Sequence, residues 1–261
     1  MTGTVLLIGS GRMGGALARG WIGRESVAIY DPAAPTIEGT TRLATLDEAI
    51  GLPTPLTVVI AVKPQLLDRV LPSLVPLAQA DALFVSVAAG ATIARYAAML
   101  GAQARIVRTM PNTPAAIGRG ITALVAAPYV DQAARDYAEL LLKAVGETVW
   151  VETEAQIDAV TAVSGSGPAY FFRFTEALAR AGEREGLSPE LAMKLARATF
   201  TGAAALADAR PDPLADLRVE VTSPGGTTAA ALGRFDADDA LDRLVADAAD
   251  ACAKRSRELA G

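Results

Sequence analysis

The first residues able to bind a ligand form a glycine-rich segment near the start of the chain. Three glycines with the spacing G-x-G-x-x-G directly follow an apolar run, Thr4–Ile8, and precede a helical pattern over 15–21. In such a strand–turn–helix the first glycine permits a tight turn, the second lets the backbone approach a pyrophosphate, and the third lets helix pack on strand. The segment predicts dinucleotide binding at the helix N-terminus, with a purely structural turn as the alternative. The predicted cofactor-binding residues of this loop are Gly9, Gly11, Arg12, Met13 and Gly14.

An acidic residue follows the second apolar run. Ser26–Tyr30 ends in Asp31, about twenty residues after the glycines, where an acid can accept a hydrogen bond from the ribose 2′-hydroxyl of NAD and repel the 2′-phosphate of NADP. Arg42 is too distant in sequence to be assigned as a phosphate-binding residue. The sequence therefore slightly favours NADH over NADPH. A turn or helix-capping role for Asp31 is the alternative.

The residue types that are missing restrict the chemistry. The 261 residues include no histidine and one cysteine, Cys252. This excludes Ser-His-Asp triads and histidine-ligated metals, and a zinc site is not expected, so catalysis must use hydroxyls, carboxylates, backbone amides or a bound cofactor. A net charge of −5 without a basic stripe argues against nucleic-acid binding. The lone cysteine, with no signal peptide and no membrane-length apolar run, predicts a cytoplasmic protein without a membrane partner.

Strand-like runs alternate with helical patterns over residues 1–151. This alternation implies right-handed crossovers and a parallel, doubly wound α/β sheet, which binds ligands at the carboxyl ends of its strands. Two of the loops expected at this edge follow the fourth and fifth strands. The expected strands are Thr4–Ile8, Ser26–Tyr30, Leu56–Val62, Ala82–Val87, Ala104–Arg108, Ile121–Ala126 and Thr148–Val151.

Residues 152–261 are expected to form an all-α domain. Its longest helix is predicted to follow the segment Ser164–Pro168, because serines can cap free N–H groups and proline is tolerated in a first turn. Broad, alanine-rich apolar faces suit helix packing and a subunit interface, which predicts a homodimer or a higher homo-oligomer. The expected helices are Gln156–Val163, Ala169–Glu185, Pro189–Asp208, Pro213–Val219, Thr227–Arg234 and Asp238–Leu259.

A second glycine-rich segment, Val221–Thr228, lies between two of these helices. Two glycines and two threonines at a helix start provide backbone N–H groups flanked by hydroxyls, which is a good site for a small carboxylate. An ordinary loop with a threonine N-cap is the alternative reading of this segment taken alone.

Taken together, these segments resemble the pyrroline-5-carboxylate reductase family from end to end. The segment at residues 222–228 is the most specific of the similarities. The segments that carry the resemblance are the glycine-rich loop, Ala61–Gln65, Ser86–Gly90, Arg108–Pro114, Ser164–Ala169 and Thr222–Thr228.

The resemblance implies an N-terminal Rossmann-type domain (1–151) followed by a helical dimerisation and substrate-binding domain (152–261). It implies hydride transfer from NAD(P)H to the C=N bond of L-1-pyrroline-5-carboxylate, giving L-proline, at sites built from both subunits. Thr228 matches the family's hydroxyl near the imine nitrogen. The implied substrate-binding residues are Ser223, Gly225, Gly226, Thr227 and Thr228, and the further implied cofactor-binding residues are Ala61, Val62, Lys63, Pro64, Ala88, Ala89, Gly90, Met110, Pro111, Asn112 and Thr113.

Two residues depart from the family's pattern. Asp31 stands where many members carry a polar, phosphate-friendly turn, and Glu220 stands where Asn or Gln is frequent. The missing histidine fits the implied chemistry, because a cyclic imine that binds already protonated needs no strong general acid, only alignment and exclusion of water.

Other functions stay open at this point. A reductase of another small cyclic imine carboxylate would use the same carboxylate site. A 3-hydroxyacid dehydrogenase would require a lysine on the helix 169–185, which has none. A dinucleotide-sensing protein without turnover is a non-catalytic alternative, and a pure scaffold would have no use for the glycine loop.

Overall fold

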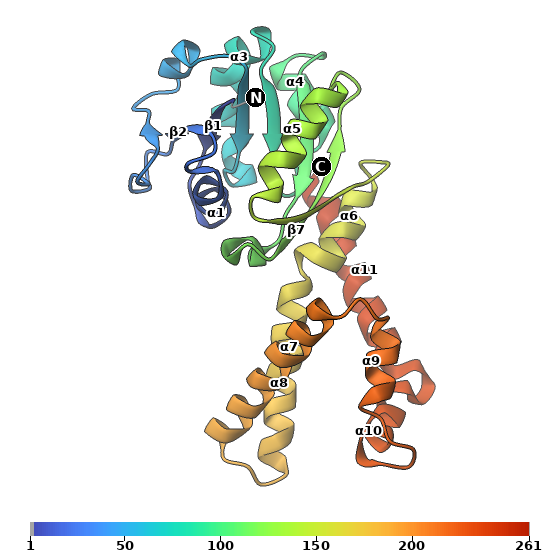
Figure 1. Cartoon of the computed structure of the whole chain (residues 1–261). Coiled ribbons are helices and arrows are strands. Elements are labelled where there is room, and N and C mark those ends of the chain that lie inside the picture. Colours follow the sequence, from blue (N-terminus) through green and yellow to red (C-terminus); the bar gives the residue numbers. More distant parts are fainter. Residues whose placement is uncertain (1–2, 261) are drawn as a thin grey trace. The chain divides into compact units, whose positions relative to one another are not determined.

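The structure, a computed structural model, describes residues 3–260 and divides into two compact units (Figure 1). The first contains the residues up to Gly165 together with the end of the chain from Cys252. The second contains Ser166–Ala251. Each unit has its own packing and is described by itself.

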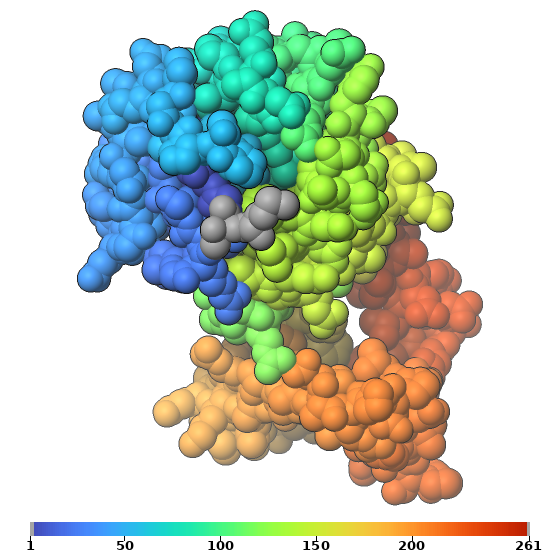
Figure 2. All heavy atoms as spheres, turned by 45° about the horizontal axis from the view of Figure 1, so that its top comes forward, coloured from blue at the N-terminus to red at the C-terminus, as the bar shows by residue number. Residues whose placement is uncertain are grey.

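The first unit is built on an eight-stranded sheet in the order β3-β2-β1-β4-β5-β6-β7-β8. The central strands are apolar and buried on both faces, as expected of parallel strands covered by helices. This confirms the predicted Rossmann-type sheet, and the residues from blue to green form one continuous body in Figure 2. The strands are β1 (Thr4–Ile8), β2 (Ser26–Tyr30), β3 (Thr41–Arg42), β4 (Leu56–Ile60), β5 (Leu83–Ser86), β6 (Arg105–Met110), β7 (Gly120–Ala126) and β8 (Gly146–Trp150).

Two features of the sheet differ from the sequence expectation. The strand β3 was not expected; it pairs in parallel with β2. The pair β6–β7 is antiparallel, although an entirely parallel core was expected. The connection from β6 to β7 holds only a short 3₁₀ turn, Thr113–Ile117, and a parallel pairing needs a longer crossover.

Helices cover the sheet of the first unit. Two of them begin at side chains that cap a backbone N–H group: Thr92 accepts from Arg95 and Asp131 accepts from Ala134. The buried indole of Trp21 donates to the carbonyl of Leu141 at 2.7 Å, which joins α1 to α5. The helices are α1 (Arg12–Trp21), α2 (Leu67–Val70), α3 (Val75–Gln79), α4 (Ile93–Leu100), α5 (Gln132–Lys143) and α6 (Gln156–Val160).

A π-helical turn, Thr161–Gly165, continues α6 toward the second unit. The predicted capping of the following helix by serine is wrong. Ser166 precedes that helix with helical backbone angles and makes no capping hydrogen bond from its side chain. A capping residue needs an extended backbone, and here the chain is already helical before the new helix starts.

The second unit is helical throughout its ordered elements. The pair α7–α8 packs through small buried residues, Ala179, Ala192 and Ala196, which lets the helices approach closely. The rings of Phe174 and Phe235 lie 6.3 Å apart and join α7 to α10. No helix within residues 3–260 is long and apolar enough to cross a membrane. The helices are α7 (Gly167–Arg184), α8 (Pro189–Ala209), α9 (Leu214–Glu220), α10 (Thr227–Asp236) and α11 (Ala240–Ala260), whose residues from Cys252 onward belong to the first unit.

Candidate functional site

The glycine loop forms the tight turn from β1 into α1. Gly9 has φ of +91°, a left-handed conformation that favours glycine, and its amide donates to the carbonyl of Tyr30 at 3.0 Å. A Cβ at Gly14 would collide with the carbonyl oxygen of Gly9, so the helix can start this close to the strand only with glycine there. A Cβ at Gly11 would meet nothing within 4 Å. The loop therefore leaves open space beside the helix N-terminus, where an anion is favoured.

Asp31 lies at the end of β2 and is tied to this loop. Its Oδ2 accepts hydrogen bonds from the amide and the hydroxyl of Ser10, at 2.7 and 3.1 Å. Its Oδ1 accepts from the amides of Ala33 and Ala34, at 2.9 and 3.1 Å. Partial burial raises the pKa of Asp31, but the hydrogen bonds from Ser10, Ala33 and Ala34 together hold that pKa below its ordinary value. The carboxylate is thus ionised at neutral pH.

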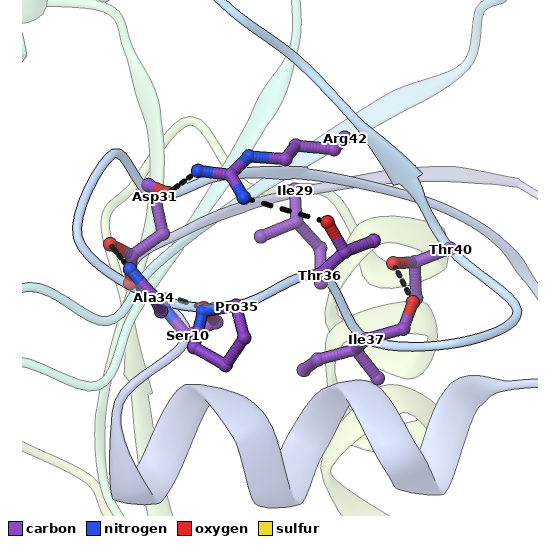
Figure 3. A pocket seen from close by; sticks show the side chains of 9 residues that line it. All are labelled: Ser10, Ile29, Asp31, Ala34, Pro35, Thr36, Ile37, Thr40 and Arg42. Carbon is purple, nitrogen blue, oxygen red and sulfur yellow. Dashed lines mark hydrogen bonds between the residues drawn. The ribbon is translucent and has the colours of Figure 1, made fainter.

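A small pocket lies beside Asp31, and Arg42 is part of it (Figure 3). The strand register places Arg42 opposite Ile29. Its guanidinium donates to the carbonyl of Asp31 at 3.2 Å and to the hydroxyl of Thr36 at 3.5 Å. The residues lining the pocket are Ser10, Ile29, Asp31, Ala34, Pro35, Thr36, Ile37, Thr40 and Arg42.

Sequence reasoning missed the position of Arg42 because it depends on a two-residue strand. A local signal is the apolar Leu43, which directly follows the polar pair Thr41 and Arg42 and is buried in the structure. The structure thereby adds a cation to the pocket in which the sequence predicted only an acid.

The loop after β4 lies next to the glycine loop. The amide of Ala61 donates to the carbonyl of Ile8 at 2.9 Å. A Cβ at Gly9 would come within about 3 Å of both Ala61 and Val62, so these residues and the glycine turn are in contact. The exposed Lys63 and the half-buried Pro64 continue from them. Among the predicted cofactor residues, the structure therefore brings together Gly9, Ala61 and Val62.

The loops after β5 and β6 begin beside each other because their strands are paired. The amide of Val87 donates to the carbonyl of Ile60 at 3.0 Å, which places the Ala88–Gly90 turn next to the end of β4. Gly90 has φ of +75° and packs against Leu259 of the last helix. Ala88 is buried, whereas Ala89 is exposed.

Asn112 holds the loop after β6 in place. Its Oδ1 accepts from the amide of Ile121 at 3.0 Å, and its Nδ2 donates to the carbonyl of Ser164 at 3.2 Å. A Cβ at Gly165 would collide with the methyl group of Met110, so glycine lets the π-helical turn lie directly on this side chain. Asn112 and Met110 therefore connect the loop to the segment Thr161–Gly165, and π turns often occur at functional sites.

The predicted carboxylate-binding segment of the second unit forms a tight turn into α10. Pro224 and Gly225, with φ of +68° at Gly225, have the residue pattern of a type II turn, and the amide of Gly226 donates to the carbonyl of Ser223 at 3.0 Å. The helix then begins at Thr227 without a side-chain cap. Because the first N–H groups of a helix have no intrahelical partner, those of Thr227 and Thr228 are available to an anion.

Glu220, one of the two departures from the family pattern, belongs to an ion pair near this segment. Its carboxylate accepts two hydrogen bonds from the guanidinium of Arg210, at 2.6 and 2.8 Å, and Arg210 also donates to Asp212 at 2.9 Å. The bonds from Arg210 lower the pKa of Glu220. The pair joins the end of α8 to the end of α9. Its carboxylate partner, Glu220, lies two residues before Thr222.

These features define a class of protein: a dinucleotide-binding fold of the Rossmann type followed by a helical domain. Residues 154–259 match the family model described as pyrroline-5-carboxylate reductase dimerisation. The chain is 41% identical to the pyrroline-5-carboxylate reductase of Pseudomonas aeruginosa over 99% of this chain and 97% of the relative. It is 38% identical to that of Haemophilus influenzae, over 98% and 97% of the two chains. The chain belongs to the pyrroline-5-carboxylate reductase family.

Solved structures agree with this assignment. A pyrroline-5-carboxylate reductase from Coxiella burnetii superposes with a TM-score of 0.90 at 33% identity, covering 100% of both chains. The pyrroline carboxylate reductase of Plasmodium falciparum, solved with NADP bound, has a TM-score of 0.84 at 28% identity and covers 99% of this chain and 98% of its own. The fold predicted from the sequence, including its helical dimerisation domain, is confirmed.

Proposed function

We propose that this protein is a pyrroline-5-carboxylate reductase, which transfers hydride from NAD(P)H to the C=N bond of L-1-pyrroline-5-carboxylate to give L-proline. The observation that carries this proposal is the similarity to reductases of that name over nearly the whole chain, 41% identity over 99% of its length. The glycine loop supports it independently, because its geometry suits a dinucleotide.

The pyrophosphate of the cofactor is proposed to lie at the start of α1. Gly11 leaves open space there, and the first turn of α1, which contains Arg12 and Met13, presents backbone N–H groups toward it. The nicotinamide end is proposed to lie along the loops after β4, β5 and β6. These loops contain the proposed contacts Ala61, Val62, Lys63, Pro64, Ala88, Ala89, Gly90, Met110, Pro111, Asn112 and Thr113.

Cofactor choice is proposed to depend on two opposite charges beside the glycine loop. The ionised carboxylate of Asp31 disfavours a 2′-phosphate by repulsion, so we propose that NADH is slightly preferred. The guanidinium of Arg42, bound to the carbonyl of Asp31 at 3.2 Å, offsets part of this repulsion. We therefore expect NADPH to be used less efficiently than NADH rather than rejected.

The substrate carboxylate is proposed to bind the backbone N–H groups at the start of α10. The residues that form this site are Ser223, Gly225, Gly226, Thr227 and Thr228, with the turn at Gly225 aiming the helix N-terminus at the anion. The hydroxyl of Thr228 is proposed to accept a hydrogen bond from the protonated imine nitrogen and so to orient the ring.

The catalytic task of these residues is alignment. NAD(P)H, when bound, supplies the hydride. The chain has no histidine, and the proposed reaction needs none, because the imine can bind with its nitrogen already protonated. The amides at the start of α10 hold the carboxylate, Thr228 fixes the N–H group, and the loops of the first unit orient the dinucleotide and exclude water.

We propose that two copies of the chain associate through the second unit, which would complete each active site. Residues 154–259 match a dimerisation domain, and helices α7 and α8 expose large apolar side chains such as Phe171, Phe172 and Leu195. Phe171 is 61% exposed in the single chain, and burying such side chains favours association. In this proposal residues 1–151 bind the dinucleotide, and residues 152–261 dimerise and bind the substrate.

The deciding experiment follows absorbance loss from NADH, and separately from NADPH, with L-pyrroline-5-carboxylate as substrate. Rapid oxidation of either cofactor supports the reductase, and faster oxidation of NADH supports the preference assigned to Asp31. Oxidation of NADPH alone would still support the reductase assignment but would refute the preference for NADH. Cofactor binding without oxidation would favour a different cyclic imine or a dinucleotide sensor.

A further inference from the structure

A buried polar network lies where two of the proposed nicotinamide loops begin. Ser86 ends β5 and pairs in register with Arg108 of the parallel strand β6, so that their side chains share one face of the sheet. Tyr96 of α4 covers this face, and its hydroxyl is hydrogen-bonded to that of Ser86. Ser86, Tyr96 and Arg108 are 1%, 0% and 4% exposed. A charged residue therefore lies inside the protein at this point.

The charge of Arg108 is compensated by Glu154. The guanidinium Nη1 donates to Oε1 of Glu154 at 2.8 Å, which bridges residues 46 positions apart. A buried charge is costly unless it is paired, so this contact is required for the packing around Arg108. Burial raises the pKa of Tyr96 to about 12, against the opposing effects of the Ser86 hydrogen bond and of the charges of Arg108 and Arg95. Tyr96 is accordingly a neutral hydrogen-bonding group.

The same oxygen of Glu154 also holds the start of α4. The amide of Ile93 donates to Oε1 of Glu154 at 2.7 Å. Ile93 follows the Ala88–Gly90 turn, and Arg108 precedes the loop that starts at Met110. One carboxylate oxygen thus joins the end of the first nicotinamide loop to the beginning of the second.

The hydroxyl of Ser86 fixes the first loop from its other side. The amide of Ala88 donates to Ser86 Oγ at 3.2 Å, and the hydroxyl of Thr109 donates to the Ser86 carbonyl at 2.9 Å. The turn is therefore held at both ends by the network, through Ala88 and through Ile93.

We propose that Glu154 is a positioning residue that sets the nicotinamide-binding loops through Arg108 and the amide of Ile93. The inference rests on the proposed function for the placement of the nicotinamide. It concerns only that end of the cofactor, because the adenosine and pyrophosphate are assigned to the glycine loop. Small displacements of the reacting ring reduce hydride transfer strongly, which gives this network a direct effect on turnover.

The test compares two ligands that differ in the nicotinamide. Dissociation constants of NADH and ADP-ribose are measured by calorimetry for the wild type and for Glu154→Gln, which keeps the shape and the acceptor oxygen but removes the charge. We expect NADH to bind about tenfold more weakly, as when a charge-assisted hydrogen bond becomes a neutral one, while ADP-ribose binding changes little. The substrate-saturated kcat should also fall.

A matched control removes an exposed carboxylate of α2 that pairs with α4, the helix that begins at Ile93. Asp68 binds Arg95 of α4 at 2.8 Å, and Asp68→Asn should leave the affinities of both ligands unchanged. Should Glu154→Gln not fold, Glu154→Asp, which keeps the charge but shortens the reach to Arg108 and to the amide of Ile93, must selectively weaken NADH binding in the same assay.

Two results would overturn the inference. An equal loss of NADH and ADP-ribose affinity would show that Glu154 acts on general stability, and an unchanged NADH affinity and kcat would show that it does not position the loops. Failure of the wild-type protein to oxidise NADH with L-pyrroline-5-carboxylate would instead count against the proposed function. The two failures can be distinguished, because the affinities for NADH and ADP-ribose are measured without turnover.

Discussion

Asp31 binds Ser10 twice through one carboxylate oxygen, at 2.7 Å to its amide and 3.1 Å to its hydroxyl. The other oxygen accepts from the amides of Ala33 and Ala34. A carboxylate has about four acceptor positions, so the folded chain already uses this group fully. A ribose hydroxyl must therefore replace one of these donors, whereas repulsion of a 2′-phosphate needs no free acceptor.

This relationship predicts how cofactor preference responds to charge. Asp31→Asn keeps one acceptor oxygen but removes the negative charge, so the ratio of kcat/KM for NADPH to that for NADH should rise about tenfold. Arg42→Ala should move the ratio in the opposite direction. Steady-state kinetics with both cofactors measure it. Glu38→Gln, which removes the same charge from an exposed position of the same loop, is the control and should leave the ratio unchanged.

The lowered pKa of Asp31 also predicts a dependence of stability on pH. Because this pKa is lower in the folded state than in the unfolded state, the carboxylate stabilises the fold above the unfolded pKa, about 4, and this stabilisation is lost as pH falls through the folded pKa. When melting temperatures are measured from neutral pH into acid, that of the wild type should fall more steeply than that of Asp31→Asn. Parallel curves for the two proteins would contradict the prediction.

Two glycines of the loop should differ in what their substitution disturbs. Gly14→Ala brings a Cβ against the carbonyl of Gly9, so it should destabilise the protein by about 1–3 kcal/mol. Gly11→Ala meets no neighbour within 4 Å and its φ is −61°, so its melting temperature should stay close to that of the wild type while NADH affinity falls. Calorimetric unfolding and NADH titration distinguish the two. Normal NADH binding by Gly11→Ala would refute the assignment of the pyrophosphate to this loop.

Thr228 is expected to orient the substrate rather than to transfer a proton. Thr228→Ala should lower kcat/KM for the substrate about tenfold without abolishing activity, the effect of one lost hydrogen bond. Thr228→Ser keeps the hydroxyl and should retain most of the rate. Initial rates over a range of substrate concentrations test this. Full activity of Thr228→Ala at every concentration would mean that the hydroxyl has no part in the reaction.

The ion pair of Arg210 and Glu220 should support the substrate segment. A bidentate arginine–carboxylate pair has defined geometry, and here it holds the chain just before Thr222. Glu220→Gln should raise the KM for the substrate while leaving the KM for NADH unchanged. The control is Glu176→Gln, which removes an exposed helix pair with Arg180. Equal KM values for wild type and Glu220→Gln would show that the pair is only a surface contact.

Much of the fold was predictable because its signals are local. The apolar run Thr4–Ile8, the three glycines and the following helix define the strand–turn–helix at the start of the chain within one short segment. The helices after residue 151 were also predicted, because their apolar faces recur with a helical period. The antiparallel pairing of β7 was not predicted, since pairing direction depends on the space available to a connection and not on strand residues.

Several predictions stay predictions. The cofactor and substrate contacts, the preference for NADH and the domain boundary at residue 151 are not decided by the fold. The structure does show where the residues behind them lie: Asp31 is bound to Ser10, and Thr227 begins α10.

By itself, the sequence determined the glycine turn after β1, the order of the longer strands and helices and the family, because each is encoded in segments of contiguous residues. Only the tertiary structure decided which distant residues meet. Arg42 reaches Asp31 through β3, and Arg108 reaches Glu154 across 46 positions. Such contacts follow from strand register and helix packing. Both are set by all the long-range interactions of the chain together, so no single segment reveals them.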